Sequence, residues 1–440
     1  MDDTIFALSS GPPPAGVAVV RISGPAVRSA LERLVDSVPE PRKVSLRFIK
    51  RSDGEILDQG LVVYFPGPAS FTGEDVAELH LHGGRAVVAG VIDALGRLEG
   101  LRAAEPGEFT RRAFLNRRLD LTEAEGLADL VAAETEAQRR QALCQAGGEL
   151  GVLFERWRER LIRARALIEA DLDFSEEEDV PGSVVAAALD EARALAEEIT
   201  RYLDDGRRGE RIRDGAEIVV LGPPNAGKSS LVNVLARRGV AIVTPEPGTT
   251  RDLIEVRLDI GGYAVTLVDT AGLRAASGIV EAEGIRRAEA RAETADLVLW
   301  LEPAGDEPRG LPANIAAPVL RLGSKADLVD SDSERGRVSG AFDVDISAET
   351  GQGIALLLER LEVFLRASFT GGDSVVVTRA RHRQGLTACV EALGRSQDAG
   401  DLELVAEEMR RAGDALGRIT GRVDVEDLLD VIFREFCIGK

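Results

Sequence analysis

One stretch of the chain has the spacing that binds the phosphates of a nucleotide. Residues 222–229 read Gly-Pro-Pro-Asn-Ala-Gly-Lys-Ser, which fits G-x-x-x-x-G-K-[ST]. An apolar strand expected over 218–221 precedes it and a helix near Ser230 follows it, so backbone N–H groups can surround a β-phosphate at the positive end of that helix. Lys228 then reaches the β- and γ-phosphates, and the Ser229 hydroxyl can ligate Mg²⁺. The sequence predicts a nucleoside triphosphate site.

Polar residues after three later strands favour guanine as the base. Asp269-Thr270-Ala271-Gly272 ends a strand, where a carboxylate can hold magnesium-bound water and a glycine N–H can meet the γ-phosphate. Ser324-Lys325-Ala326-Asp327 follows the next strand, and the Asp327 carboxylate can accept two hydrogen bonds, from guanine N1–H and the exocyclic amine, which adenine cannot supply. Ser347-Ala348 follows a further strand. This ordered set resembles the guanine-nucleotide domain of translation-factor-type GTPases, although Ser324 stands where they have Asn, which leaves base specificity to Asp327.

The residues that would assist hydrolysis are unusual. Many GTPases have Gln after D-x-x-G to orient the attacking water, whereas this chain has Leu273, which cannot bond water. Glu281 and Glu283 lie a few residues further on. Spacing identifies no arginine finger, although Arg251 and Arg274 are near, so charge on the transition state needs another source.

The elements that position these residues fall into three patterns. Residues 1–118 mix strands (17–22 and 61–65) with helices, and residues 119–213 show helical spacing alone. Strands and helices then alternate over 214–369, which predicts a mostly parallel sheet wrapped by helices, before helical spacing resumes over 370–440. The strands expected there lie at 218–221, 265–269, 297–301, 319–322 and 342–346. The predicted fold class is α/β and α multidomain: an α+β N-terminal domain, then a helical domain carrying an inserted P-loop domain.

Composition limits the classes of function. The 440 residues carry a net charge of −21, which opposes generic binding of nucleic-acid backbones. Residues 1–118 are neutral, with 15 basic and 15 acidic side chains. No apolar run approaches the roughly 20 residues of a membrane span, and the start lacks the basic region of a signal peptide. Three cysteines cannot form a disulfide framework, so we expect a cytoplasmic, reduced protein without a membrane partner.

The C-terminal residues and several motifs along the chain share the pattern of one family. The ending Cys437-Ile438-Gly439-Lys440 is similar to the C-x-G-K terminus of the MnmE (TrmE) tRNA-modification GTPases. Further matching motifs lie at 16–24, 71–75, 82–84, 106–110, 119–121, 248–252 and 269–274. The resemblance implies an N-terminal folate-binding and dimerisation domain (1–118), a helical domain in two parts (119–213 and 370–440) and a G domain (214–369).

The resemblance also implies a reaction and its partners. With MnmG, a flavoprotein that carries FAD, the family adds an aminomethyl or carboxymethylaminomethyl group to C5 of the wobble uridine of certain tRNAs. A tetrahydrofolate derivative (the 5-formyl or 5,10-methylene form) supplies the one-carbon unit. Hydrolysis of GTP, stimulated by potassium, drives a conformational cycle of a homodimer. The expected ligands are thus GTP, Mg²⁺, K⁺ and a tetrahydrofolate.

Residue roles follow from the resemblance position by position. Thr250 joins Ser229 on Mg²⁺, Glu281 orients the nucleophile through water, and Lys228 and Thr250 act with it in catalysis. Potassium is assigned to Asn225, Thr244, Glu246 and Thr249, where the cation replaces an arginine finger. Folate is assigned to Arg21, Glu78, Arg118 (where Lys is common) and Lys440. The full set expected to bind GTP is Asn225, Ala226, Gly227, Lys228, Ser229, Ser230, Thr244, Thr249, Thr250, Asp269, Thr270, Ala271, Gly272, Ser324, Lys325, Asp327, Ser347 and Ala348.

Several alternatives stay open at this point. The chain can instead be a GTP-switched scaffold for ribosome or RNA assembly, although such a protein has no evident need for residues 1–118 or the C-terminal motif. Cys437 can be a nucleophile activated by the adjacent lysine or, more commonly for such a residue, a small buried thiol. An amphipathic helix is expected over 427–433, which would deliver the tail to the folate pocket of the N-terminal domain. Arg156, Arg160 and Arg163 can touch tRNA phosphates or pair with neighbouring acids.

Overall fold

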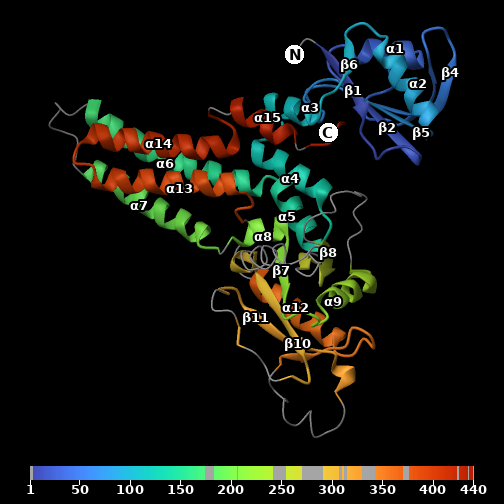
Figure 1. Cartoon of the computed structure of the whole chain (residues 1–440). Coiled ribbons are helices and arrows are strands. Elements are labelled where there is room, and N and C mark those ends of the chain that lie inside the picture. Colours follow the sequence, from blue (N-terminus) through green and yellow to red (C-terminus); the bar gives the residue numbers. More distant parts are fainter. Residues whose placement is uncertain are drawn as a thin grey trace, which may run out of the picture. The chain divides into compact units, whose positions relative to one another are not determined.

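The computed structural model describes residues 3–173, 183–205, 207–240, 254–269, 291–306, 310–311, 315–329, 342–369, 376–423, 426–434 and 436–439. The chain forms two units (Figure 1). The first contains residues 1–128, 145–199 and 384–440, and the second contains residues 129–144 and 200–383. The chain leaves the first unit within α4 (Leu121–Ala132) and returns within α5 (Glu136–Ala146). It leaves this unit again within α7 (Ser183–Leu203) and returns within α13 (Ala380–Asp398). The boundaries expected at 118, 213 and 369 stay a prediction.

A six-stranded sheet organises the N-terminal part of the first unit. Its order is β3-β4-β5-β2-β1-β6, and its neighbours are antiparallel except for the parallel pair β1 and β6. The bounds are β1 Thr4–Leu8, β2 Ala15–Ser23, β3 Ser45–Lys50, β4 Ile56–Phe65, β5 Val76–Gly83 and β6 Leu101–Ala103. Helices α1 (Val27–Val35) and α2 (Arg85–Gly96) bury the apolar side chains of one face, the inner face. The predicted α+β domain and the strands near 17–22 and 61–65 are confirmed.

Helices form the rest of the first unit. They are α3 (Glu108–Leu115), α6 (Glu149–Asp173), α14 (Leu402–Thr420), α15 (Glu426–Arg434) and parts of α4, α5, α7 and α13. Helix α14 packs along α6 (Figure 1). The amphipathic helix expected over 427–433 is confirmed as α15, because Leu429, Ile432 and Phe433 pack on Leu121 at the start of α4.

The second unit is built on a mostly parallel sheet, as predicted. Its order is β12-β11-β10-β7-β9-β8, and only β8 is antiparallel to its neighbour. The bounds are β7 Ala216–Leu221, β8 Ile254–Ile260, β9 Tyr263–Asp269, β10 Leu297–Pro303, β11 Val319–Ser324 and β12 Val344–Asp345. Its helices include α8 (Arg208–Asp214), α9 (Lys228–Leu235) and α12 (Ile354–Phe369), with the π-helical turn η1 (Ala236–Val240) and the 3₁₀ turn η3 (Ala326–Leu328).

Strand β8 is the element that sequence reasoning missed here. Its residues alternate between apolar and polar types, which is the usual sign of a strand. Gly261 and Gly262 both have positive φ, at 61° and 86°, so the chain reverses tightly and β8 pairs antiparallel with β9. The strand expected over 342–346 is present but short, as β12.

Membrane-spanning helices and disulfide bonds were the two features considered from composition. No helix in the described ranges is long and apolar enough to cross a membrane. Cys144, Cys389 and Cys437 are free thiols.

Candidate active site

The phosphate-binding loop lies between β7 and α9, where the motif predicted it. Gly222 follows β7 with φ +146°, and a Cβ at this position would lie 2.1 Å from the carbonyl oxygen of Leu301. Only glycine fits such an approach of two backbones. Asn225 holds a left-handed conformation with φ +63°, which Asn tolerates better than most residues. The loop conformation therefore depends on both residue types.

Lys228 and Asp269 bring opposite charges to this loop. The Nζ of Lys228 donates to the carbonyl oxygens of Gly222 at 2.8 Å and Pro223 at 3.0 Å, so the ammonium group lies against the loop itself. Asp269, only 1 % exposed, ends β9 and pairs in register with Val220 of β7. Because parallel strands end at the same edge of a sheet, the carboxylate belongs to the phosphate side of the site. The Ser229 hydroxyl and the Asp269 carboxylate offer the oxygen ligands that Mg²⁺ prefers.

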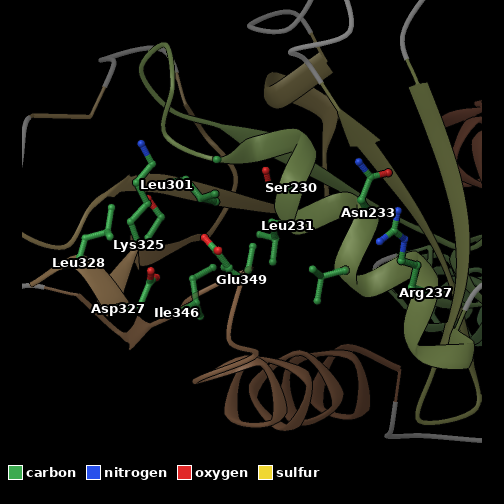
Figure 2. Close-up of a pocket in the computed structure, with 14 residues that line it drawn as sticks. Ser230, Leu231, Asn233, Arg237, Leu301, Lys325, Asp327, Leu328, Ile346 and Glu349 are labelled. Carbon is green, nitrogen blue, oxygen red and sulfur yellow. The ribbon is translucent and has the colours of Figure 1, made fainter.

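A cavity of about 400 Å³ lies between α9 and the base-binding loops (Figure 2). One wall comes from α9 and η1, and the other from η3 and the segment after β12. Figure 2 shows Asp327, Lys325 and Leu328 on the side opposite α9. The lining residues are Gly227, Ser230, Leu231, Asn233, Val234, Arg237, Leu301, Ser324, Lys325, Asp327, Leu328, Ile346, Ala348 and Glu349. The cavity thus brings together six residues of the predicted set and is large enough for a nucleoside. They are Gly227, Ser230, Ser324, Lys325, Asp327 and Ala348.

Ser324 and Ser347 support the loops through their hydroxyl groups. Ser324 is buried, and its Oγ donates to the carbonyl oxygen of Glu302 at 3.1 Å. Ser347 is also buried, and its Oγ accepts from the N–H of Thr350 at 3.1 Å. Asp327 is exposed in the cavity and is the acceptor best placed for a base.

Several predicted site residues lie outside the described ranges. They are Thr244, Glu246, Thr249, Thr250, Thr270, Ala271, Gly272, Glu281 and Lys440, together with Arg251, Leu273, Arg274 and Glu283. Their predicted roles stay predictions.

A second polar cluster lies on the outer face of the first sheet, the face away from α1 and α2. Arg21 of β2 and Glu78 of β5 are direct cross-strand partners, and the guanidinium donates to one carboxylate oxygen from Nη2 at 2.9 Å and from Nε at 3.1 Å. His80 Nε2 lies 3.3 Å from the other oxygen of Glu78. The guanidinium also lies 5.4 Å from the ring centre of Phe71 and 5.8 Å from that of Phe109. The structure thus brings two predicted folate residues, Arg21 and Glu78, together in a half-buried ion pair beside two aromatic rings.

Arg112 is a structural residue beside this cluster that sequence reasoning missed. Its side chain is 0 % exposed, and the guanidinium pairs with Asp3 at 2.8 Å, Glu108 at 3.0 Å and Glu74 at 3.2 Å. Burial raises the pKa of Glu108, but hydrogen bonds from Arg102 and from the Glu105 N–H lower it by more. The pKa of Glu108 therefore lies below its usual value. The spacing of Glu108 and Arg112, four residues apart on α3, was the one available signal.

The C-terminal tail is held against the N-terminal sheet of the same chain. Ile438 forms an antiparallel bridge with Pro106, and Ser9 Oγ donates to the Gly439 carbonyl oxygen at 2.8 Å. Ser9 follows β1, whose Ala7 pairs with Arg21. The expectation of a buried Cys437 thiol was wrong: Cys437 and Ile438 are exposed, whereas the residues on either side of them, Phe436 and Gly439, are buried.

Other charged residues take structural roles. Arg156 pairs with Glu198 at 3.2 Å, Arg160 with the same residue at 2.5 Å, and Arg163 approaches Glu159 at 3.9 Å. These arginines therefore neutralise acids on α6 and α7. Over the described part of the chain, no group of three or more His, Cys, Asp or Glu could hold a metal ion, and His82 instead binds Asp58 at 2.8 Å.

A phosphate loop between β7 and α9, a buried carboxylate on the adjacent strand and a base cavity containing Asp327 define a P-loop GTPase. A family model described as "GTP-binding protein TrmE N-terminus" matches residues 4–118, and one described as "MnmE helical domain" matches residues 121–437. The chain belongs to the MnmE family of tRNA modification GTPases and is a GTP hydrolase.

Relatives match over the whole length. The tRNA modification GTPase MnmE of Parvibaculum lavamentivorans is 56% identical over 445 residues, which cover 100% of both chains. That of Mesorhizobium japonicum is 54% identical and covers 100% of this chain and 99% of its own. A solved structure of Era with MgGDPNP and a ribosomal RNA segment is 21% identical to this chain. The match covers 40% of this chain and 66% of the Era chain, and the TM-score is only 0.28.

Proposed function

We propose that this GTPase works with an MnmG-type flavoprotein carrying FAD to add an aminomethyl or carboxymethylaminomethyl group to C5 of the wobble uridine of tRNA, using a tetrahydrofolate derivative. The observation that carries the proposal is the match of the TrmE N-terminal and MnmE helical families to residues 4–118 and 121–437. A GTP-switched scaffold for ribosome or RNA assembly would have no evident need for residues 4–118. We place the reaction in the cytoplasm. The test is wobble-uridine modification in tRNA from a strain that lacks the protein, with unmodified uridine as the expected result and full modification as the refuting one.

In the proposed GTP site, each residue has a distinct task. Lys228 neutralises charge on the phosphates, Asp327 selects guanine, and Ser229 with Thr250 holds Mg²⁺, whose positive charge stabilises the charge that develops on the phosphates. Glu281 orients water from its proposed position. The close fit of Lys228 against the loop, at 2.8 Å from the Gly222 carbonyl, supports its task.

Potassium is proposed to bind at Asn225, with Thr244, Glu246 and Thr249 completing the site. The left-handed conformation of Asn225 within the phosphate loop supports a special task for this residue. We expect much faster hydrolysis in K⁺ than in Na⁺ at equal ionic strength, and Asn225→Ala should remove the difference while GDP still binds. Equal rates of the wild-type protein in both salts would contradict the assignment.

Folate is proposed to bind beside Arg21, Glu78, Arg118 and Lys440. A carboxylate suits the N–H donors of a pterin ring, and the nearby, half-buried Phe71 ring offers apolar surface. Glu78→Gln keeps the shape of the side chain but removes its charge, so we expect it to weaken binding of 5-formyltetrahydrofolate in calorimetry. Unchanged affinity would show that folate binds elsewhere. The exposed Cys437 is available as a nucleophile, and Cys437→Ser should then bind folate but fail to modify tRNA.

A homodimer is proposed through the outer face of the first sheet. Val17, Leu46, Phe48 and Leu61 are exposed on this face, although such side chains usually avoid water in a monomer. A second copy would cover them. Light scattering should show that Phe48→Glu shifts the mass from dimer to monomer, whereas Val363→Glu, an exposed valine on α12, should not. A monomeric wild-type protein would contradict the proposal.

A further inference from the structure

Two exposed arginines stand at the end of α3, next to the cluster of Arg21 and Glu78. Asn116 Nδ2 donates to the Thr72 carbonyl oxygen at 2.7 Å, so the end of α3 packs on the loop that contains Phe71. A methyl group on Gly73 in this loop would lie 3.3 Å from Cγ of Arg118. Arg118 and its neighbour Arg117 therefore stand at the margin of the proposed folate site.

Arg117 has a conformation that would suit glycine better. The N–H of Arg117 donates to the Phe114 carbonyl oxygen at 2.9 Å, and the N–H of Arg118 donates to the Ala113 carbonyl oxygen at 2.8 Å. These two bonds form the Schellman pattern that ends a helix. In this pattern the residue at the position of Arg117 is left-handed, and its φ is +57°. Glycine takes this conformation without steric cost, whereas arginine does not. An arginine in this strained position suggests a task for its charge.

Both guanidinium groups are available to a ligand. Among the residues that the structure describes, neither Arg117 nor Arg118 has an ion pair or a side-chain hydrogen bond, and both side chains are exposed. The nearby Asp120 does not neutralise them, because its Oδ1 accepts from Thr122 Oγ1 at 2.7 Å and from the Glu123 N–H at 2.8 Å at the start of α4. Two free positive charges therefore face solvent at the edge of the site.

We propose that Arg117 and Arg118 form a subsite for the γ-linked glutamate tail of polyglutamylated folates. This inference rests on the proposed folate function and names the form of folate that the site takes. Each added glutamate carries one more carboxylate, which a guanidinium group binds with paired hydrogen bonds. A short anionic chain fits a pair of charges better than RNA does, because RNA needs a wider basic surface and the arginines of α6 are already paired with acids.

The test compares 5-formyltetrahydrofolate with one and with five glutamates by calorimetry on the full chain. Exposed charge pairs are worth little individually, so two of them predict about tenfold tighter binding of the pentaglutamate at low salt. The gain should shrink as salt rises. Arg117→Gly should reduce the gain and leave monoglutamate affinity unchanged, and the double change with Arg118→Gln should abolish it. The control is Arg33→Gln on α1, which removes an exposed charge from the opposite side of the sheet. This variant should show the full gain in affinity for the pentaglutamate.

The outcomes distinguish the failure of the polyglutamate subsite from the failure of the proposed folate site. Because glycine suits the left-handed position, Arg117→Gly should unfold at the same or a higher temperature, so a lost gain reports charge and not misfolding. Equal affinity of wild type for both folates would overturn the subsite while the folate proposal stands. No binding of either folate would overturn both. Loss of tRNA affinity in Arg117→Gly with the pentaglutamate gain intact would assign the charges to RNA and overturn the inference.

Discussion

Asp327 and Ser324 occupy one short motif, yet the structure predicts opposite consequences for their loss. Asp327 is exposed in the base cavity, where its carboxylate can accept both guanine donors. Hydrogen bonds to a charged group are each worth about 1.5–3 kcal/mol, and an exposed carboxylate must first lose water, so the low end applies. Two bonds then give about 3 kcal/mol, which is about 10²-fold in Kd. Asp327→Ala should weaken GDP binding by about that factor.

Ser324→Ala serves as the matched comparison. The Ser324 hydroxyl is buried and donates to the Glu302 carbonyl oxygen at 3.1 Å, so its loss removes a bond within the protein. That bond contributes about 1 kcal/mol to the free energy of unfolding, while the affinity for GDP should barely change.

Equilibrium titration with fluorescent GDP and IDP measures both effects. IDP lacks the exocyclic amine, so the wild-type protein should prefer GDP and Asp327→Ala should lose the preference. The reasoning is refuted if Ser324→Ala weakens GDP binding as much as Asp327→Ala does, because the serine would then contact the base itself.

Further predictions concern hydrolysis and the buried charges. Glu281→Ala should lower kcat about 10²-fold with little change in GTP affinity, as measured by single-turnover hydrolysis, since an orienting group acts in the transition state. Arg112→Met should destabilise the N-terminal sheet by about 3–5 kcal/mol, because it leaves Glu74 and Glu108 without their buried cation; hydrogen exchange that matches wild type would contradict this. The pKa of Glu108 is lowered because hydrogen bonds, chiefly from Arg102, outweigh its burial, so its contribution to stability is present above about pH 4 and is lost as pH falls through its lower folded pKa. Thermal unfolding between pH 6 and pH 3 checks that sign.

Local spacing determined much of the nucleotide site. The loop from Gly222 to Ser229, the carboxylate Asp269 and the pair Lys325 and Asp327 each follow a strand, and parallel strands end at a common edge. Their order along the chain was therefore enough to predict that they meet. The helix α15 was predictable for a similar reason, because its apolar side chains recur with the period of a helix.

The sequence alone did not reveal which charges pair. Arg21 and Glu78 are 57 residues apart, and Arg112 and Asp3 are 109 apart, so no local pattern connects them. Their partners depend on the register of β2 with β5 and on the packing of α3 beside β1. The same holds for Ser324, whose hydroxyl direction depends on the neighbouring strand β10.

The sequence by itself thus determined the family, the fold class and the order of the phosphate and base residues, because these follow from motifs and from periods of hydrophobicity within single elements. Only the tertiary structure decided that Arg21 and Glu78 pair with each other, that Cys437 is exposed, and that Arg117 takes a left-handed conformation beside the loop of Phe71. The physical reason is that burial, ion pairing and backbone strain depend on contacts between elements distant in the chain, and such contacts leave no periodic signal in the residues that make them.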